Sequence, residues 1–286
     1  MTPGLYEVVT TRSGAKSIRN VVLDETMHNP VGPWEEANTL YIGPSRLKER
    51  LSTHFAEDLV VYDVGLGAAA NAIAAIRAAY NAFSTGESRR LHIVSFEKDL
   101  ELLAFAIANA DAFHHFEGLV PALEAVLHDH HWTSPCGRIV WDLRAGDFLS
   151  LIDQETTHPH IIFHDPYSPA SNPEMWNLQC FQKLYARIKP SDEPTTLFTY
   201  SIATPVRAAM VLAGFYGGHG PRTGLKHETT QASTHLEALE QPFGERWLNR
   251  WIRSHTKYPL GTAPGEFEAV TQKMMNHPQF VGVTLS

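Results

Sequence analysis

Cysteines and long apolar runs are scarce in this 286-residue chain. The two cysteines, Cys136 and Cys180, lie far apart in the sequence, which argues against a disulfide framework and favours a reducing, cytoplasmic environment. No run of about twenty apolar residues is present, so no transmembrane helix is expected. The N-terminus also lacks the basic-then-apolar order of a secretory signal.

Positive charge is scarce as well. The 23 Lys and Arg residues against 31 Asp and Glu give a net charge of −8. This balance argues against a protein that coats nucleic acid, although it allows a local basic patch. Sixteen histidines are present, including His114-His115 and His128-Asp129-His130-His131. Their spacing matches no common metal-site pattern, so we expect solvated loop histidines and no metal.

Strand and helix patterns alternate through the middle of the chain. Strands are predicted at 59–64, 91–96, 139–143, 160–164, 195–200 and 224–232. Helices are predicted at 44–55, 68–83, 99–110, 119–129, 173–188 and 204–213. This alternation predicts an α/β fold with a doubly wound, mostly parallel sheet.

The two ends of the chain differ from this core. Runs at 5–10 and 18–23, separated by a turn at 11–16, predict a β-hairpin, and a loop rich in Gly and Pro follows at 25–36. The tail from about 236 onward is expected to be a helical appendage. We therefore expect three segments, at 1–57, 58–232 and 233–286.

A glycine-containing turn follows the first core strand. Gly65-Leu66-Gly67 allows the backbone to approach a ligand closely, and Glu97 at the end of the second strand is placed to bind ribose hydroxyls. Ala70 stands where a dinucleotide fingerprint has its third glycine, and the Asp63 carboxylate would repel a pyrophosphate. These features favour S-adenosylmethionine over NAD; the alternative is an ordinary strand–helix turn.

The most informative stretch, 164–176, directly follows the apolar run 161–163. Ligands of open α/β sheets bind beyond the carboxyl ends of the strands, where this order places Asp165. Asp165-Pro166-Tyr167 resembles the Asp/Asn-Pro-Pro-Phe/Tyr loop of amine-directed methyltransferases. Asp165 would accept a proton from the amine or orient it, Pro166 would fix the turn, and Tyr167 would cover the substrate base or the cofactor. In the alternative, Asp165 only caps the following segment.

The longer string, through Asn172-Pro173-Glu174-Met175-Trp176, resembles a narrower family. It is similar to the methyltransferase module of the MnmC-type enzymes that complete the wobble uridine of bacterial tRNA. Ser95-Phe96-Glu97-Lys98, Gly146-Asp147 and the turn from Asp63 to Asn71 resemble family segments in the same order. The similarity runs from about residue 18 to 232. It departs at Pro166 and Tyr167, where the family usually has Gly and Phe.

The resemblance implies a Rossmann-like, S-adenosylmethionine-dependent methyltransferase without the oxidase domain of the bifunctional members. It would act on the amine of a 5-aminomethyluridine in tRNA. The expected catalytic residues are Asp165, Pro166 and Tyr167. The expected cofactor-binding residues are Asp63, Gly65, Gly67, Asn71, Glu97, Lys98, Asp147 and Asp165. Substrate or RNA contacts are expected at Glu36, Trp176, Arg207, Arg250 and Arg253.

A basic amphipathic helix is predicted near the C-terminus. One face carries Arg246, Arg250, Arg253 and Lys257, and the adjacent face carries Trp247, Leu248, Trp251 and Ile252. The arginines would contact tRNA phosphates. In the alternative, the tryptophan face docks on the core and the arginines pair with acids such as Glu237 or Glu240.

Two other functions remain open at this point. One is a methyltransferase for a small-molecule amine or another nucleoside, and the other is a non-catalytic cofactor-binding module or assembly partner.

Overall fold

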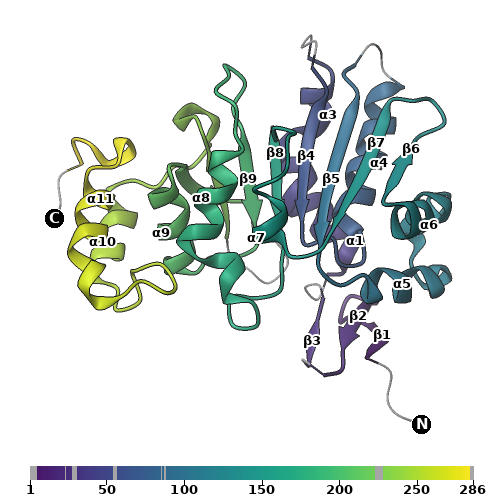
Figure 1. Cartoon of the computed structure of the whole chain (residues 1–286), viewed down its shortest axis with the longest axis horizontal. Coiled ribbons are helices and arrows are strands. Elements are labelled where there is room, and N and C mark those ends of the chain that lie inside the picture. The colour runs from purple at the N-terminus through teal and green to yellow at the C-terminus, as the bar shows by residue number, and fades with distance from the viewer. Residues whose placement is uncertain are drawn as a thin grey trace.

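The computed structural model describes residues 5–22, 24–27, 31–53, 57–84, 86, 88–222 and 228–283. Its centre is an eight-stranded sheet with the order β10-β11-β9-β8-β4-β5-β7-β6 (Figure 1). The strands are β4 (Leu59–Val64), β5 (Leu91–Glu97), β6 (His131–Thr133), β7 (Ile139–Ala145), β8 (Ile161–His164), β9 (Thr196–Thr199), β10 (Tyr216–Gly220) and β11 (Thr229–Ser233). Strands β7, β5, β4, β8 and β9 are parallel, which confirms the predicted doubly wound sheet.

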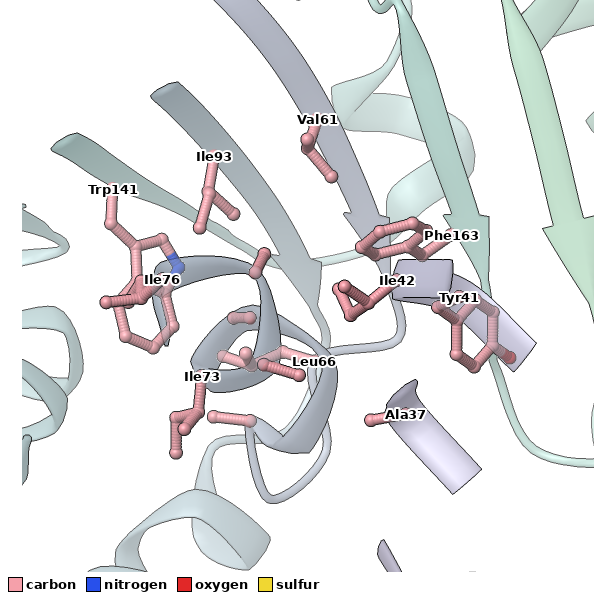
Figure 2. Packing of buried hydrophobic residues seen from close by; sticks show 14 of the residues in the cluster. Ala37, Tyr41, Ile42, Val61, Leu66, Ile73, Ile76, Ile93, Trp141 and Phe163 are labelled. Carbon is pink, nitrogen blue, oxygen red and sulfur yellow. The ribbon is translucent and has the colours of Figure 1, made fainter. Parts of the chain in front are cut away.

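Helices cover both faces of this sheet. They are α4 (Ala70–Phe83), α5 (Glu101–Ala108), α6 (Val120–Asp129), α7 (Phe148–Leu151), α8 (Leu178–Ala186) and α9 (Thr204–Ala213). Successive strand residues point to opposite faces, so Val61 belongs to the buried cluster that contains α4 and Tyr62 to the one that contains α8. On the α4 face, Ile73 and Ile76 pack near Ile93 and Trp141 (Figure 2).

A small N-terminal sheet lies beyond the carboxyl ends of the parallel strands (Figure 1). Its strands β1 (Tyr6–Thr10), β2 (Lys16–Asn20) and β3 (Glu25–Thr26) are antiparallel in that order. The predicted hairpin is therefore confirmed, although its second strand begins two residues earlier than expected.

The loop predicted at 25–36 is wrong at both ends, since strand β3 occupies its first two residues and a helix its last four. Pro33 begins helix α1 (Pro33–Glu36), which continues into a π-helix, η1 (Ala37–Ile42). Tyr41 and Ile42 of this segment pack beside Val61 and Phe163 of the sheet (Figure 2). The segment therefore brings Glu36 to the carboxyl edge of the sheet.

Two of the predicted helices are divided in the structure. The helix expected at 44–55 is divided into α2 (Gly43–Ser45) and α3 (Leu47–Leu51), because Arg46 is left-handed with φ 51°. Residues 54 and 55 lie outside the described residues, as do 224–227 of the last predicted strand. The helix expected at 173–188 is a 3-10 turn, η4 (Pro173–Trp176), followed by α8, whose first turn is capped by the Asn177 side chain.

Strand β10 was not predicted because three of its five residues are glycine. A Cβ atom at Gly217 would lie 2.6 Å from the Phe243 ring, so close packing requires glycine there. Beyond β11 the tail is helical as expected, with α10 (Glu245–Arg253) and α11 (Phe267–Met275) at the far edge of the molecule (Figure 1). The remaining 3-10 turns are η2 (Ala110–Ala112), η3 (His114–Phe116), η5 (Leu236–Ala238), η6 (Pro264–Glu266) and η7 (Pro278–Phe280).

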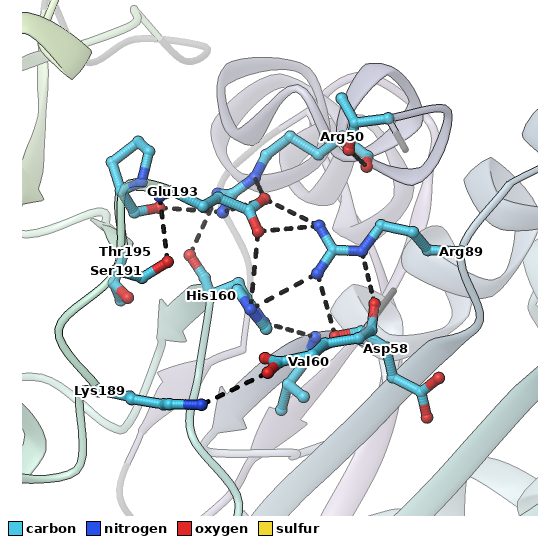
Figure 3. A network of polar contacts seen from close by, with 12 residues as sticks. Arg50, Asp58, Val60, Arg89, His160, Lys189, Ser191, Glu193 and Thr195 are labelled. Carbon is cyan, nitrogen blue, oxygen red and sulfur yellow. Dashed lines mark hydrogen bonds and ion pairs between the residues drawn. The ribbon is translucent and has the colours of Figure 1, made fainter. Parts of the chain in front are cut away.

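A buried polar network ties together the amino ends of the strands (Figure 3). The Glu193 carboxylate pairs with Arg89 at 2.8 Å and with Arg50 at 3.0 Å. Arg50 also donates to the main-chain oxygen of His160, whose ring accepts from the Val60 N–H. Burial lowers the pKa of His160 to about 4. The network therefore holds a carboxylate between two guanidinium groups, on the opposite edge from Glu36.

The histidines are not all solvated. His115 is 4% exposed and stacks beside Trp34, so the prediction for this residue is wrong; its main-chain oxygen binds Arg77. His128, His130 and His131 are exposed as expected. No cluster suited to a metal ion and no helix long and apolar enough to cross a membrane occur within the described ranges.

Candidate active site

A cavity of about 390 Å³ opens at the carboxyl ends of the parallel strands. Neighbouring strands β4 and β8 lead into helices on opposite faces of the sheet, and such a switch point is where open α/β sheets bind ligands. Among the predicted site residues, Glu36, Gly65, Gly67, Glu97, Lys98, Asp147, Asp165, Pro166 and Tyr167 line the cavity. The structure thus brings together residues that are up to 131 positions apart (36 to 167).

The glycine turn after β4 is pressed against the loop after β8. Gly65 has φ +90°, and a Cβ atom there would lie 2.8 Å from the main-chain oxygen of Asp165. Glu97 fixes the rest of the turn, since its carboxylate accepts a hydrogen bond from the Gly67 N–H at 3.0 Å and another from the Lys98 N–H at 2.8 Å. The turn is therefore open to a ligand on one side and braced on the other.

Asp165 is the carboxyl group at the centre of the cavity wall. The Asn71 side chain donates to its Oδ2 at 2.9 Å. Burial, together with the negative charge of Glu36, raises the pKa of Asp165 to about 7, while Tyr41 and Asn71 partly offset this rise. A carboxyl group with this pKa exchanges a proton readily near neutral pH, as a general base requires.

Side chains beneath the loop hold its main chain in place. The Tyr200 hydroxyl donates to the Pro166 oxygen at 3.0 Å, and the Trp176 indole N–H donates to the Tyr167 oxygen at 2.7 Å. Burial lowers the pKa of His164 to about 4, and its Nε2 donates to the main-chain oxygen of Met175 at 2.8 Å. The loop that carries Asp165 is therefore fixed before any ligand binds.

Two of the expected substrate contacts are wrong. Trp176 is fully buried, and its indole N–H supports the loop after β8 at the Tyr167 oxygen rather than facing the cavity. Arg207 is 3% exposed, its Nη1 pairs with Glu228 at 3.0 Å, and its Nε donates to Thr230. Both residue types are common in RNA sites, but here each satisfies buried polar groups of the protein.

Two expected cofactor contacts lie behind the cavity wall. Asn71 holds Asp165, as described above. Asp63 is 1% exposed and accepts a hydrogen bond from the Ser95 hydroxyl at 2.8 Å, and burial raises its pKa to about 7. Neither side chain lines the cavity, so the structure gives them supporting positions.

The predicted basic helix, α10, docks through its tryptophans. Trp247 and Trp251 are buried in a cluster with residues of α9, which confirms the docking expected in the alternative. Arg250 and Arg253 are exposed, and neither forms an ion pair with a described acid. Their contact with RNA stays a prediction.

The cavity is strongly acidic. The carboxyl groups of its wall belong to Glu25, Glu36, Glu97, Asp147, Asp165 and Glu174. Lys98 is the one Lys or Arg among the described residues that line it. Glu25, Glu174 and Tyr200 were not predicted as site residues. The position of Tyr200, one residue after the end of β9, could have identified it, whereas nothing in the sequence points to Glu25. Such a wall attracts a cation and repels a polyphosphate.

These features fit S-adenosylmethionine, which carries a sulfonium and an ammonium group. The acidic wall complements both charges, Gly65 and Gly67 line the cavity without side chains of their own, and Glu97 remains at the end of β5 to meet a ribose. Asp147 lines the same end of the cavity, while its Oδ2 caps α7 by accepting from the Ser150 N–H at 3.1 Å.

Comparisons with known proteins agree with this site. Residues 111–235 match the family model described as S-adenosyl-L-methionine-dependent methyltransferase. The chain is 29% identical, over 66% of its length, to the tRNA 5-methylaminomethyl-2-thiouridine biosynthesis bifunctional protein MnmC of Aeromonas salmonicida. It is 31% identical, over 65% of its length, to the MnmC protein of Aeromonas hydrophila. It covers 30% of each of these relatives.

A solved structure shares the fold. The crystal structure of MnmC2 from Aquifex aeolicus matches with a TM-score of 0.69, over 96% of this chain and 85% of that chain, at 23% identity. The chain is thus similar in sequence to S-adenosylmethionine-dependent methyltransferases of the MnmC type and shares the fold of MnmC2.

Proposed function

We propose that this protein methylates the amine of a 5-aminomethyluridine-type nucleotide at the wobble position of tRNA. The observation that carries the proposal is Asp165, a carboxyl group with a pKa of about 7 in an acidic cavity at the switch point of the sheet. The names of the MnmC relatives, which specify 5-methylaminomethyl-2-thiouridine in tRNA, support the substrate. This activity implies a cytoplasmic enzyme.

The acidic wall performs the first step, which is to bind the substrate as an ammonium ion. An alkyl amine of this kind has a pKa of about 10 in water, so nearly all of it is charged at neutral pH. Glu36, beside Asp165, attracts this charge. Binding therefore favours the ammonium form, although only the neutral amine has a lone pair to attack with.

Asp165 performs the second step, which is to accept one proton from the ammonium at its carboxylate. The contacts of Tyr200 and Trp176 fix the main chain of the loop that carries this carboxylate, which limits the positions that the bound amine can take. When bound, S-adenosylmethionine supplies a methyl group on a positively charged sulfur, and the S–C bond breaks as the N–C bond forms. The two protons left on the nitrogen stay there, so the methylated product is a secondary ammonium ion, and the sulfur leaves as a neutral thioether.

A methyltransferase for small-molecule amines is the second candidate. The acidic wall would bind any small ammonium ion. Pro166 and Tyr167 also match the loop of amine-directed methyltransferases more closely than they match the Gly and Phe of the MnmC pattern. The two candidates differ in substrate size and not in chemistry, so one assay separates them.

The test is methyl transfer from labelled S-adenosylmethionine to bulk tRNA from a strain that lacks the final methylation. We expect label in the wobble nucleoside, and none with tRNA from the parent strain, which is already methylated. A panel of free primary amines serves as the competing substrate set. Label in free amines and none in tRNA would overturn the proposal in favour of the second candidate.

We further propose that Arg250 and Arg253 contact tRNA phosphates from the outer face of α10. The double reversal Arg250→Glu/Arg253→Glu should then weaken tRNA binding and reduce the slope of log K against log salt by about 2, one unit for each lost phosphate contact. The matched control, Arg46→Glu/Lys48→Glu, makes the same change in charge on exposed residues near α3 and should bind normally. Equal salt slopes for both variants would refute the contact.

A further inference from the structure

A second cavity, of about 290 Å³, lies between the N-terminal sheet and the catalytic loop. We call it the sheet cavity. Leu5, Tyr6, Asn20 and Val22 line it from the N-terminal side, and Glu97, Asp99, Leu102 and Tyr167 line it from the core. It shares Glu97, Leu102 and Tyr167 with the first cavity. The two cavities therefore meet at Tyr167, the residue that follows Asp165 and Pro166.

The wall of the sheet cavity suits a flat, uncharged ring. Two phenol rings, Tyr6 and Tyr167, stand in it together with apolar side chains from Leu5, Val22 and Leu102. Its charged groups are the carboxylates of Glu97 and Asp99, which accept N–H groups and repel phosphates. Its volume of about 290 Å³ is just below the usual range of small-molecule sites, about 300 to 1,000 Å³, and suits a single ring.

The N-terminal sheet also sets the position of the Tyr167 ring. Asn20 is 5% exposed, and its Oδ1 accepts a hydrogen bond from the Val22 N–H at 3.0 Å. Both the Asn20 and Tyr6 side chains interact with the Tyr167 hydroxyl, while Tyr6 packs against Phe105 with ring centroids 5.8 Å apart. Tyr167 is thus held at its main chain by Trp176 and at its hydroxyl by the sheet.

We propose that the sheet cavity binds the pyrimidine ring of the target nucleotide, stacked on Tyr167, with its amine directed toward Asp165. A base that is modified by an enzyme must leave the helical stack, and an aromatic wall is the usual receptor for it. The amine is one methylene from the ring. Tyr167 lines both cavities and Asp165 lines the first, so a ring on Tyr167 can extend its amine into the cavity that holds the general base. The inference rests on the proposed function.

A filling variant tests the inference. Val22 is 75% exposed at the rim, so Val22→Trp narrows the cavity without disturbing the core. We expect KM for tRNA to rise about tenfold, with kcat and the Kd of S-adenosylmethionine unchanged, because only ground-state binding is lost. Val281 is 73% exposed and lies outside both cavities, so Val281→Trp is the matched control and should behave as wild type.

A crosslink locates the base directly. An anticodon stem-loop RNA with 4-thiouridine at the wobble position is irradiated with the protein and S-adenosylhomocysteine, and the adducts are mapped by mass spectrometry. We expect adducts in the peptides that carry Tyr6 or Val22. Adducts confined to 25–27 or 172–176, or an unchanged KM for Val22→Trp, would overturn the inference. Absence of methyl transfer to tRNA by the wild type would overturn the proposed function itself.

Discussion

Replacement of Asp165 by Asn should reduce kcat for methyl transfer by about 100- to 10,000-fold, the usual contribution of a general base. Asparagine keeps the shape of the side chain and can still bind Asn71, but it cannot accept the ammonium proton. In the wild type, kcat should rise with pH and level off above the Asp165 pKa of about 7, because the carboxylate is the active form. The variant should lack this inflection.

The control is Asp147→Asn, the same substitution at another aspartate in the cavity wall. It should change the KM for S-adenosylmethionine and leave the inflection near pH 7 in place. If Asp165→Asn kept more than about a third of the wild-type kcat, or the same inflection, then Asp165 would be a cap or an orienting group and not the base.

The same variant should be more stable than wild type at alkaline pH. The folded-state pKa of Asp165, about 7, lies above the value of about 3.9 for an unfolded aspartate. The folded protein therefore holds this proton more tightly, and the stability that it provides below about pH 4 is lost as the pH rises through 7. At pH 8, Asp165→Asn should increase the free energy of unfolding by about 1–3 kcal/mol, and at pH 4 it should change little. Urea denaturation at both values measures the difference.

Replacement of Glu193 by Ala should lower the free energy of unfolding by about 3–5 kcal/mol. The carboxylate is 7% exposed and bridges Arg50 and Arg89, so its removal takes a shared ion-pair partner from two buried guanidinium groups. Urea denaturation at pH 7 measures the loss. The conservative Glu193→Gln should fall between wild type and alanine, because it retains part of the hydrogen bonding.

The matched control is Glu57→Ala, which removes an exposed ion pair with Lys189 whose side chains are 68% and 57% exposed. This change should cost about 0.5 kcal/mol or less. Equal losses for Glu193→Ala and Glu57→Ala would show that the buried network contributes no more than a surface pair does.

The parallel core could be predicted from the sequence because its strands are continuous apolar runs bounded by turn residues, as at 59–64 and 161–163. Gly65, Glu97 and Asp165 could be predicted for the same reason, since each directly follows or ends such a run. Strand β10 could not, because its three glycines are required by close contacts with Phe243, Gln241 and Thr229 and not by strand preference. The division into three segments stays a prediction.

The errors in the site have a common physical cause. Trp176 and Arg207 combine a polar group with a large apolar surface, so the same side chain suits a ligand site or the protein interior. Only the distant partners, the Tyr167 oxygen and the Glu228 carboxylate, decide between these environments. Glu25 joins the cavity through the packing of the N-terminal sheet, which no local pattern records.

The contact between Gly65 and the Asp165 main chain has a mechanical consequence. In-line transfer tolerates little error in the gap between donor and acceptor atoms. Here the turn that would support the donor and the loop that would support the acceptor touch each other directly, without an intervening side chain. When the sheet flexes, both move together, and their spacing is kept. The contact therefore limits changes in the distance between the turn after β4 and the loop after β8, and so in the distance over which the methyl group would move.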